Sequence, residues 1–133
     1  MANKKNIAAL LQQVHDMTSV LDNIGSYVYC KYLAGKYTYV NADVAALFHS
    51  TVQDIIGKDD SHFFDLNVLD ELLKNDRKVI FDKVSLVFEE NNLIKSTGKV
   101  HTYKTIKNPI FNEMGEIIGL SGISKPTSAA AAS

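Results

Sequence analysis

Hydrophobic side chains recur at alternating intervals of three and four residues through the first 24 residues of the chain. This spacing places them on one stripe of a helix, and its mean of about 3.5 residues is the repeat of a coiled coil. The stripe consists of Ile7, Leu10, Val14, Met17, Leu21 and Ile24. We predict an N-terminal amphipathic helix within residues 1–24 whose stripe forms the seam of a homodimer. The alternative is that the stripe packs on the helix's own domain, which Leu11 and Val20 favour because they widen it.

Two groups of alternating hydrophobic and polar residues predict β-strands. After Gly25, residues 26–33 and 37–41 are rich in tyrosine and valine and flank a short turn, which is typical of a β-hairpin. Three more alternating segments lie in the C-terminal third, at residues 84–90, 99–107 and 117–124. Because only loops join these three segments, they predict an antiparallel meander.

The residues between the two strand groups predict helices. Asn41 and Ser50 or Thr51 are candidate N-caps of two short helices, and Asn67 is the candidate N-cap of a longer one. This order predicts an α+β domain, with one five-stranded antiparallel sheet that carries short helices on one face. We expect it to occupy residues 25–127, before a low-complexity tail at 128–133.

The composition narrows the function classes. A length of 133 residues suits one domain, and a net charge of −1 lacks the basic excess that binds DNA or RNA, so no nucleic-acid partner is predicted. Cys30 is the only cysteine, which excludes an internal disulfide and a cysteine-based zinc site and favours a reducing, cytoplasmic location. No apolar run approaches the roughly 18 residues of a membrane span, so no membrane contact by this chain is expected.

Several short motifs follow one another in an order that resembles a known family. Residues 35–41 read Gly-Lys-Tyr-Thr-Tyr-Val-Asn, and residues 54–58 read Asp-Ile-Ile-Gly-Lys. Three more motifs, Lys-Asn-Pro-Ile, Gly-Glu-Ile-Ile-Gly and Gly-Ile-Ser, lie between residues 107 and 124. With the order of the predicted elements, these motifs resemble the PAS family of sensory domains over roughly residues 21–124.

The resemblance implies the PAS fold and the role of sensory input domain in a larger signal transduction protein. Its output domain would lie outside this chain, as in bacterial two-component or cyclic-di-GMP signalling. No phosphate-binding loop, paired catalytic carboxylates or nucleophile with its base occurs here, so the chain is not predicted to be an enzyme. Lys125-Pro126-Thr127 departs from the family's usual Asp-Ile-Thr, whose aspartate commonly links the last strand to the output helix.

No cofactor and no metal site are predicted. The flavin-binding photosensory branch of the family uses a cysteine in a short helix, whereas Cys30 lies on the first predicted strand, so covalent flavin photochemistry is excluded. Haem-binding members commonly take a histidine from the long helix, and residues 67–83 contain none. His62 lies just upstream and is better explained as a capping or surface histidine than as a haem ligand.

Aromatic and polar side chains of the predicted strands form the candidate ligand site. Strand alternation puts Tyr27, Tyr29 and Lys31 on one face of the first strand, and His101, Tyr103 and Thr105 on one face of a later strand. The resemblance implies that these faces meet under the helices. The candidate ligand-binding residues are Tyr29, Lys31, His101, Tyr103, Thr105 and Ser124.

The predicted function is reception of a signal, from a small ligand or a partner, and its relay through dimeric helices. A ligand carboxylate or carbonyl would satisfy the buried tyrosine hydroxyls, with Lys31 or His101 adding charge. The alternative is a dimerisation or protein-interaction scaffold without a ligand, in which the aromatic side chains fill the core and Lys31 reaches solvent.

Overall fold

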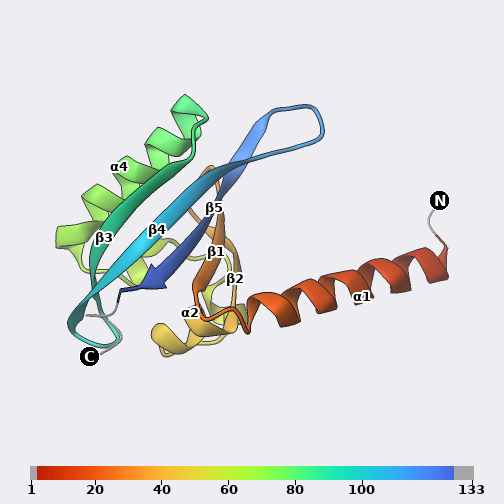
Figure 1. Ribbon diagram of the computed structural model, residues 1–133, viewed down its shortest axis with the longest axis horizontal. Coiled ribbons are helices and arrows are strands. Elements are labelled where there is room, and N and C mark those ends of the chain that lie inside the picture. The colour runs from red at the N-terminus through yellow and green to blue at the C-terminus, as the bar shows by residue number, and fades with distance from the viewer. Residues whose placement is uncertain (1–2, 128–133) are drawn as a thin grey trace.

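The computed structural model describes residues 3–127, apart from the side chains of residues 66 and 67, and the predicted tail at 128–133 lies outside the described residues. Its N-terminal half contains α1 (Lys4–Leu21), β1 (Tyr27–Tyr32), β2 (Tyr37–Val40), α2 (Ala42–Leu47), α3 (Val52–Ile55) and the 3-10 helix η1 (Asp60–His62). Then follow α4 (Leu66–Asp82), β3 (Leu86–Ile94), β4 (Lys99–Phe111) and β5 (Ile117–Pro126). Figure 1 shows the arrangement, which confirms the predicted α+β order.

Five strands within the described range form one antiparallel sheet in the order β2-β1-β5-β4-β3 (Figure 1). β1 pairs with β5 from Tyr27 opposite Ser124 to Tyr32 opposite Gly119. The first hairpin therefore lies beside the C-terminal strand, and β1 occupies a central place in the sheet. This confirms the predicted five-stranded antiparallel sheet.

Strand β3 is longer than the sequence pattern predicts, because the expected loop from residue 91 onward begins as strand. Asparagine is depleted in strands, yet Asn91 and Asn92 lie opposite Thr102 and His101 in the β3–β4 ladder. The side-chain amide of Asn92 also donates a 2.6 Å hydrogen bond to Glu90 Oε1, so it is satisfied within the protein. Pairing with β4 therefore outweighs the local preference for a loop.

The helices cover one face of the sheet. Along β4, Tyr103, Thr105 and Lys107 are buried, whereas Val100 and Ile106 on the opposite face are exposed. Helix α2 packs against β1, α3 against β2, and α4 against β3, β4 and β5. Among residues 3–127, no helix has the length and hydrophobicity that crossing a bilayer requires.

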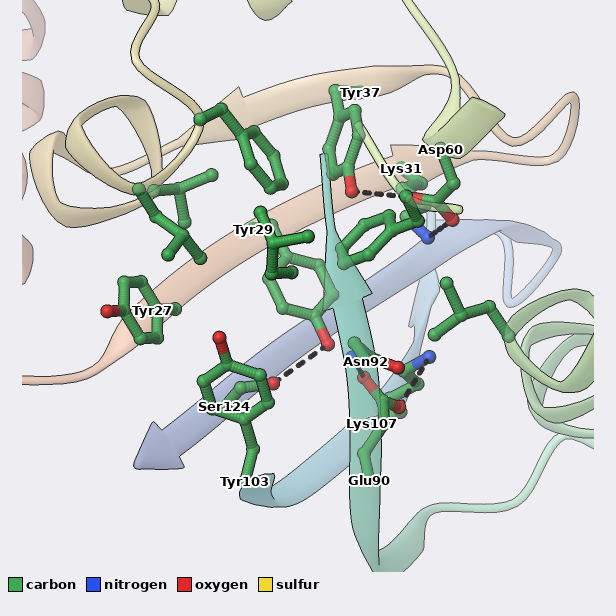
Figure 2. A pocket seen from close by; sticks show the side chains of 16 residues that line it. Tyr27, Tyr29, Lys31, Tyr37, Asp60, Glu90, Asn92, Tyr103, Lys107 and Ser124 are labelled. Atoms are coloured by element: carbon green, nitrogen blue, oxygen red, sulfur yellow. Dashed lines mark hydrogen bonds and ion pairs between the residues drawn. The ribbon is translucent and has the colours of Figure 1, made fainter. Parts of the chain in front are cut away.

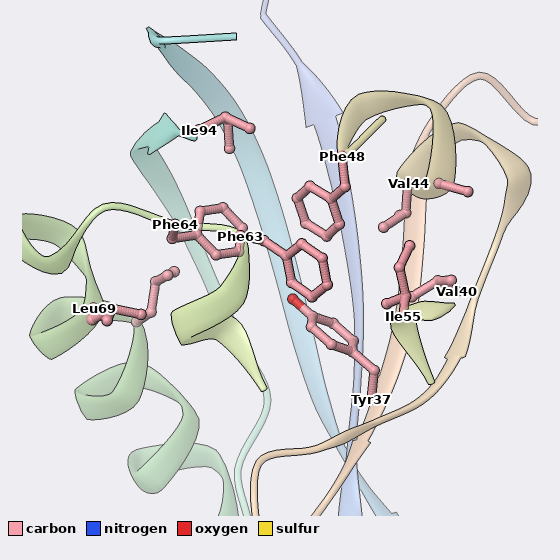
Figure 3. Close-up of a cluster of buried hydrophobic side chains, with 11 residues drawn as sticks. Tyr37, Val40, Val44, Phe48, Ile55, Phe63, Phe64, Leu69 and Ile94 are labelled. Carbon is pink, nitrogen blue, oxygen red and sulfur yellow. The ribbon is translucent and has the colours of Figure 1, made fainter. Parts of the chain in front are cut away.

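The hydrophobic core lies between the covered face and the short helices (Figure 3). Phe48 stacks on Phe63 with ring centroids 4.3 Å apart and meets Phe64 edge-on at 5.5 Å. Burial of each such side chain stabilises the fold by about 1.5–3 kcal/mol. The core also contains Tyr37, Val40, Val44, Ala45, Ile55, Leu69, Leu72 and Ile94. These contacts hold the short helices over the sheet and so form one wall of the site described below.

Helix α1 projects away from the rest of the domain (Figure 1) and contains no buried residue. Its stripe is solvent-exposed at Ile7, Leu10, Val14 and Met17, with exposed fractions of 49–59%. Leu21, at the end of the helix, is partly buried. The described residues of the domain therefore leave the outer part of the stripe uncovered, which is not the arrangement expected if the helix packed on its own domain.

Asn41 joins the end of α1 to the hairpin and to α2. Its side-chain amide donates hydrogen bonds to the carbonyl oxygens of Leu21 (2.9 Å) and Ser26 (2.8 Å). Its Oδ1 accepts from the backbone N–H groups of Val28 and Val44, both at 3.2 Å. Because Asn41 is fully buried, these bonds are shielded from water. The base of α1 is therefore tied directly to β1.

Candidate functional site

A cavity of about 40 Å³ lies between the covered face of the sheet and helices α2, η1 and α4 (Figure 2). One buried water needs roughly 10–15 Å³ of such space, so the cavity has room for a few waters or a few ligand atoms. Its polar lining consists of Lys31, Asp60, Glu90, Asn92, Lys107 and Ser124, with Tyr27, Tyr29, Tyr37 and Tyr103. Its apolar lining consists of Val44, Leu47, Phe48, Phe64, Leu72 and Ile94.

Lys31 lies inside the protein and does not reach solvent, because only 2% of its surface is exposed. A register shift between Cys30 and Lys31 in the pairing of β1 with β2 marks its position in the strand. Its ammonium donates to Asp60 on η1 and, at 2.9 Å, to Asp76 Oδ2 on α4. The suggestion that Lys31 reaches solvent is therefore wrong, and its charge is already paired within the domain.

Lys107 is a second buried cation that the sequence analysis missed. It is 1% exposed, and its Nζ donates to Asp76 Oδ1 at 2.7 Å and lies 3.6 Å from Glu90 Oε2. Asp76 thus joins Lys31 and Lys107 through its two carboxylate oxygens. These two lysines and the carboxyl groups of Asp60, Asp76 and Glu90 form what we call the ion cluster. Figure 2 shows its members Lys31, Asp60, Glu90 and Lys107.

The opposite charges in the ion cluster outweigh the effect of burial. Burial alone would lower the pKa of Lys31, but Asp60 and Asp76 raise it above its usual value. Burial likewise disfavours charge on Lys107, yet its surroundings, Asp76 and Glu90 included, raise its pKa well above the usual range. Burial would raise the pKa of Asp76, and the two ammonium groups lower it instead. Both lysines are therefore charged at neutral pH, and so is Asp76.

The tyrosine hydroxyls at the cavity differ in whether they have partners. Tyr37 donates to Asp60, and Tyr29 lies within hydrogen-bonding distance of Ser124 Oγ at 3.3 Å. Ser124 is itself 2.9 Å from Thr105 Oγ1. Tyr103 is 3% exposed, and burial raises the pKa of its hydroxyl above the usual range. Neither the Tyr103 hydroxyl nor Glu90 Oε2 has a hydrogen-bond partner among the described residues.

The structure brings together only part of the predicted site. Tyr29, Lys31, Tyr103 and Ser124 line the cavity, whereas Thr105 is fully buried behind Ser124. The ring of His101 stacks on that of Tyr103, with centroids 6.2 Å apart, and its Nε2 lies 2.9 Å from Thr97 Oγ1. Burial, with Lys99 nearby, lowers the pKa of His101. His101 therefore supports the ring of Tyr103 and contributes no surface to the cavity.

The residues considered for cofactors lie away from the cavity. Cys30 is partly buried on β1, and burial raises the pKa of its thiol. His62 is exposed on η1, 3.4 Å from Asp59. Within the part of the chain that the structure describes, no group of three histidine, cysteine or acidic side chains is placed to hold a metal ion.

Signals for the missed residues do exist in the sequence. Lys107 follows Tyr103 and Thr105 at intervals of two, so it shares their face of β4. Asp76 stands in phase with Leu72 and Val79 on the apolar face of α4, where a charged residue signals a buried partner. Glu90 likewise follows Leu86 and Phe88 at intervals of two, so it shares their face of β3.

Comparison with known proteins agrees with the fold. The family model described as the PAS fold matches residues 21–132. This chain belongs to the PAS family. The assignment confirms the resemblance found in the sequence and accounts for the order of strands and helices around the cavity.

The PAS domain is also similar to three individual proteins. A diguanylate cyclase of Vibrio cholerae serotype O1 (strain ATCC 39541 / Classical Ogawa 395 / O395) is 39% identical over 106 residues, which are 79% of this chain and 33% of that protein. The chain therefore spans about a third of this relative's length. The PAS domain of a Colwellia psychrerythraea protein has a TM-score of 0.73 at 14% identity, covering 88% and 98% of the two chains. VqmA bound to DPO has a TM-score of 0.74 at 22% identity, covering 88% and 57%.

Proposed function

We propose that this PAS domain is the sensory input domain of a larger cytoplasmic signalling protein and that it binds a small ligand in the cavity beside the ion cluster. The similarity to part of a diguanylate cyclase supports an output domain that acts in cyclic-di-GMP signalling. The chain itself then carries out no reaction. VqmA, of the same fold, is a protein whose structure contains bound DPO, which supports a ligand at the cavity here.

The observation that carries the proposal is a pair of buried polar atoms at the cavity that make no hydrogen bond, although one of them, Glu90 Oε2, lies 3.6 Å from Lys107. The Tyr103 hydroxyl and Glu90 Oε2 are buried without a hydrogen-bond partner among the described residues, next to free space. Leaving a buried polar group unsatisfied costs about 1–3 kcal/mol. Hydrogen bonds from a ligand to both groups would offset part of this cost, so these two groups favour ligand binding in the cavity.

The proposed relay to the output runs through a dimer of α1. The outer stripe of α1 is exposed, and its repeat of about 3.5 residues matches the stripe of a second copy better than a flat surface. Asn41 bonds to Leu21 at the base of α1 and to Val28, which lies between Tyr27 and Tyr29 on β1. A shift of β1 on ligand binding therefore reaches the base of the helix directly.

A second candidate function is a dimerisation or protein-interaction scaffold that binds no ligand. The small volume of the cavity favours it, as does the packing of Tyr27 against Tyr103, whose ring centroids are 5.5 Å apart. A scaffold needs only the exposed stripe of α1. The two functions differ in whether the cavity is ever occupied.

The test is ligand binding by the wild type, by Tyr103→Phe and by Tyr32→Phe, which removes an exposed hydroxyl on β1 as the matched control. Small-molecule libraries, with DPO included, are screened by thermal shift, and the protein is weighed by native mass spectrometry directly after isolation. We expect a ligand whose affinity falls by about two- to tenfold in Tyr103→Phe only, since one hydrogen bond to a neutral group contributes roughly 0.5–1.5 kcal/mol. A bare protein mass together with no hit in the screen would overturn the ligand proposal and favour the scaffold.

A further inference from the structure

The ion cluster has one more carboxylate than it has ammonium groups. Lys31 is held by Asp60 and Asp76, and Lys107 is held by Asp76 and lies 3.6 Å from Glu90. No cation on the cavity wall, as far as the described residues show, is left free to receive a ligand carboxylate. This differs from the sequence-based expectation, in which Lys31 adds charge for an anionic ligand.

The Glu90 carboxyl group and the Tyr103 hydroxyl, which has no hydrogen-bond partner among the described residues, lie on neighbouring strands. Glu90 on β3 is directly opposite Tyr103 on β4, so their side chains share the covered face and their Cβ atoms are roughly 5 Å apart. Both residues are more than nine-tenths buried, at 7% and 3% exposure, and both line the cavity. Glu90 Oε1 accepts a hydrogen bond from Asn92, whereas Oε2 accepts none and has Lys107 Nζ 3.6 Å away. Figure 2 shows Glu90 beside Asn92 and Lys107, and Tyr103 further along the same wall of the cavity, near Ser124.

A groove beside the cavity is negatively charged, as the ion cluster is. It lies between α4 and β3 and shares Leu72, Glu90 and Asn92 with the cavity lining. Glu71 and Glu89 add two more acidic side chains, and its lining within the described residues contains no lysine or arginine. A negatively charged groove raises the local concentration of cations and repels anions.

The other wall of the cavity is apolar and aromatic. Val44, Leu47 and Phe48 from α2 face the polar side. The rings of Tyr27 and Tyr103 meet edge to face at 5.5 Å, and tyrosine faces attract organic cations. The ligand that fits this lining has one cationic donor end and one short apolar end.

We propose, on the basis of the sensory function proposed above, that the cavity binds a small organic ammonium ion. Its N–H groups donate to Glu90 Oε2 and to the oxygen of Tyr103, and its alkyl end lies against the α2 side chains. One positive charge balances the excess carboxylate of the ion cluster. The cavity volume of about 40 Å³ limits the ligand to a few heavy atoms unless side chains move.

Three probes of four heavy atoms each test the class of ligand: n-propylammonium, 1-propanol and acetate. Binding is followed at matched ionic strength by chemical-shift titration of the wild type, of Glu90→Gln and of Glu113→Gln. The last is the control, because it removes the same charge from the exposed turn between β4 and β5. Ligands of this size bind weakly: a ceiling near −1.5 kcal/mol per heavy atom limits the dissociation constant to about 40 μM or weaker.

We expect n-propylammonium to bind the wild type and Glu113→Gln with equal affinity. Its affinity for Glu90→Gln should be lower by about tenfold or more, since a hydrogen bond to a charged group is lost. Equal affinity for all three proteins overturns the assignment to Glu90. Preferential binding of acetate or 1-propanol, weakened by Tyr103→Phe, overturns the ligand class and leaves the sensory function standing. No binding by any probe, together with a failed library screen, removes both proposals. If Glu90→Gln does not fold, Tyr103→Phe with the same three probes gives the decision.

Discussion

Replacing Asp76 by Asn removes the carboxylate that joins the two buried lysines. The side-chain amide keeps one oxygen as an acceptor, but its NH₂ group then faces an ammonium ion that Asp76 now holds at 2.7 or 2.9 Å. Lys31 retains Asp60, whereas Lys107 retains only Glu90, 3.6 Å away. Lys107 therefore loses more of its charge compensation than Lys31 does.

The expected loss follows from the burial of these charges. Breaking a buried ion pair from one side costs about 3–5 kcal/mol, because it leaves an uncompensated charge away from water. Domains of this size are stable by roughly 5–15 kcal/mol in total. The Asp76→Asn variant should therefore melt about 10 °C or more below the wild type. Asp70→Asn, an exposed position on the same helix, should change the stability by less than about 0.5 kcal/mol.

Urea unfolding at several pH values measures the loss of stability and tests whether the charge on Asp76 is its cause. The pKa of Asp76 is lowered in the folded state, so its stabilisation is complete above the unfolded-state value of 3.8 and is lost as the pH falls through the lower folded value. The difference in unfolding free energy between the wild type and Asp76→Asn should therefore stay constant from pH 7 to about pH 5 and shrink below about pH 4. If Asp76→Asn is as stable as Asp70→Asn at pH 7, the ion cluster does not hold α4 to the sheet as described.

Two further predictions concern glycines on β5 and the stripe of α1. A Cβ on Gly119 would lie 2.1 Å from the backbone oxygen of Lys31, whereas one on Gly122 would meet the ring of Tyr29 at 2.2 Å. Gly119→Ala should thus lower the free energy of unfolding, measured in urea, by about 3 kcal/mol, and Gly122→Ala should lower it by about 1 kcal/mol. The reason is that the Tyr29 side chain can move aside more easily than the backbone of Lys31, and equal losses would contradict it. Changing Leu10 and Val14 together to Glu should halve the mass measured by light scattering without lowering the melting temperature of the domain, and a wild-type monomer at high concentration would refute the proposed dimer.

The sequence was sufficient for the five-stranded sheet and for four of the sixteen residues that line the cavity. Alternation along the strands placed Tyr29, Lys31 and Tyr103 on the correct faces, because the period of two does not depend on which strands are neighbours. The partners of Lys31 could not be found in this way. Asp60 and Asp76 lie 29 and 45 residues away along the chain, on η1 and α4, and only the packing of these helices on the sheet brings them to β1.

The difference between the predicted and the observed site is mainly one of charge. A strand pattern that contains one lysine suggests a positive site, whereas the folded domain surrounds two lysines with three carboxyl groups. At one end of the ion cluster Asp76 ties α4 to the sheet. At the other end Glu90 lines the cavity, and its Oε2 lies 3.6 Å from Lys107 without accepting a hydrogen bond.

This arrangement also indicates how occupation of the cavity would change the domain. A cation at Glu90 would stand beside Lys107 and weaken its attraction to that carboxylate, so Lys107 would depend more on Asp76. Asp76 in turn bonds Lys31 on β1, the strand that Asn41 ties to the base of α1 through Val28 and Leu21. A ligand shifts such an equilibrium only by its difference in affinity for the two arrangements. In the proposed mechanism that difference in affinity arises at the Glu90–Lys107 contact. Glu90→Gln should therefore abolish the effect of the ligand on the α1 dimer, which light scattering measures. An unchanged effect would show that the relay does not run through this contact.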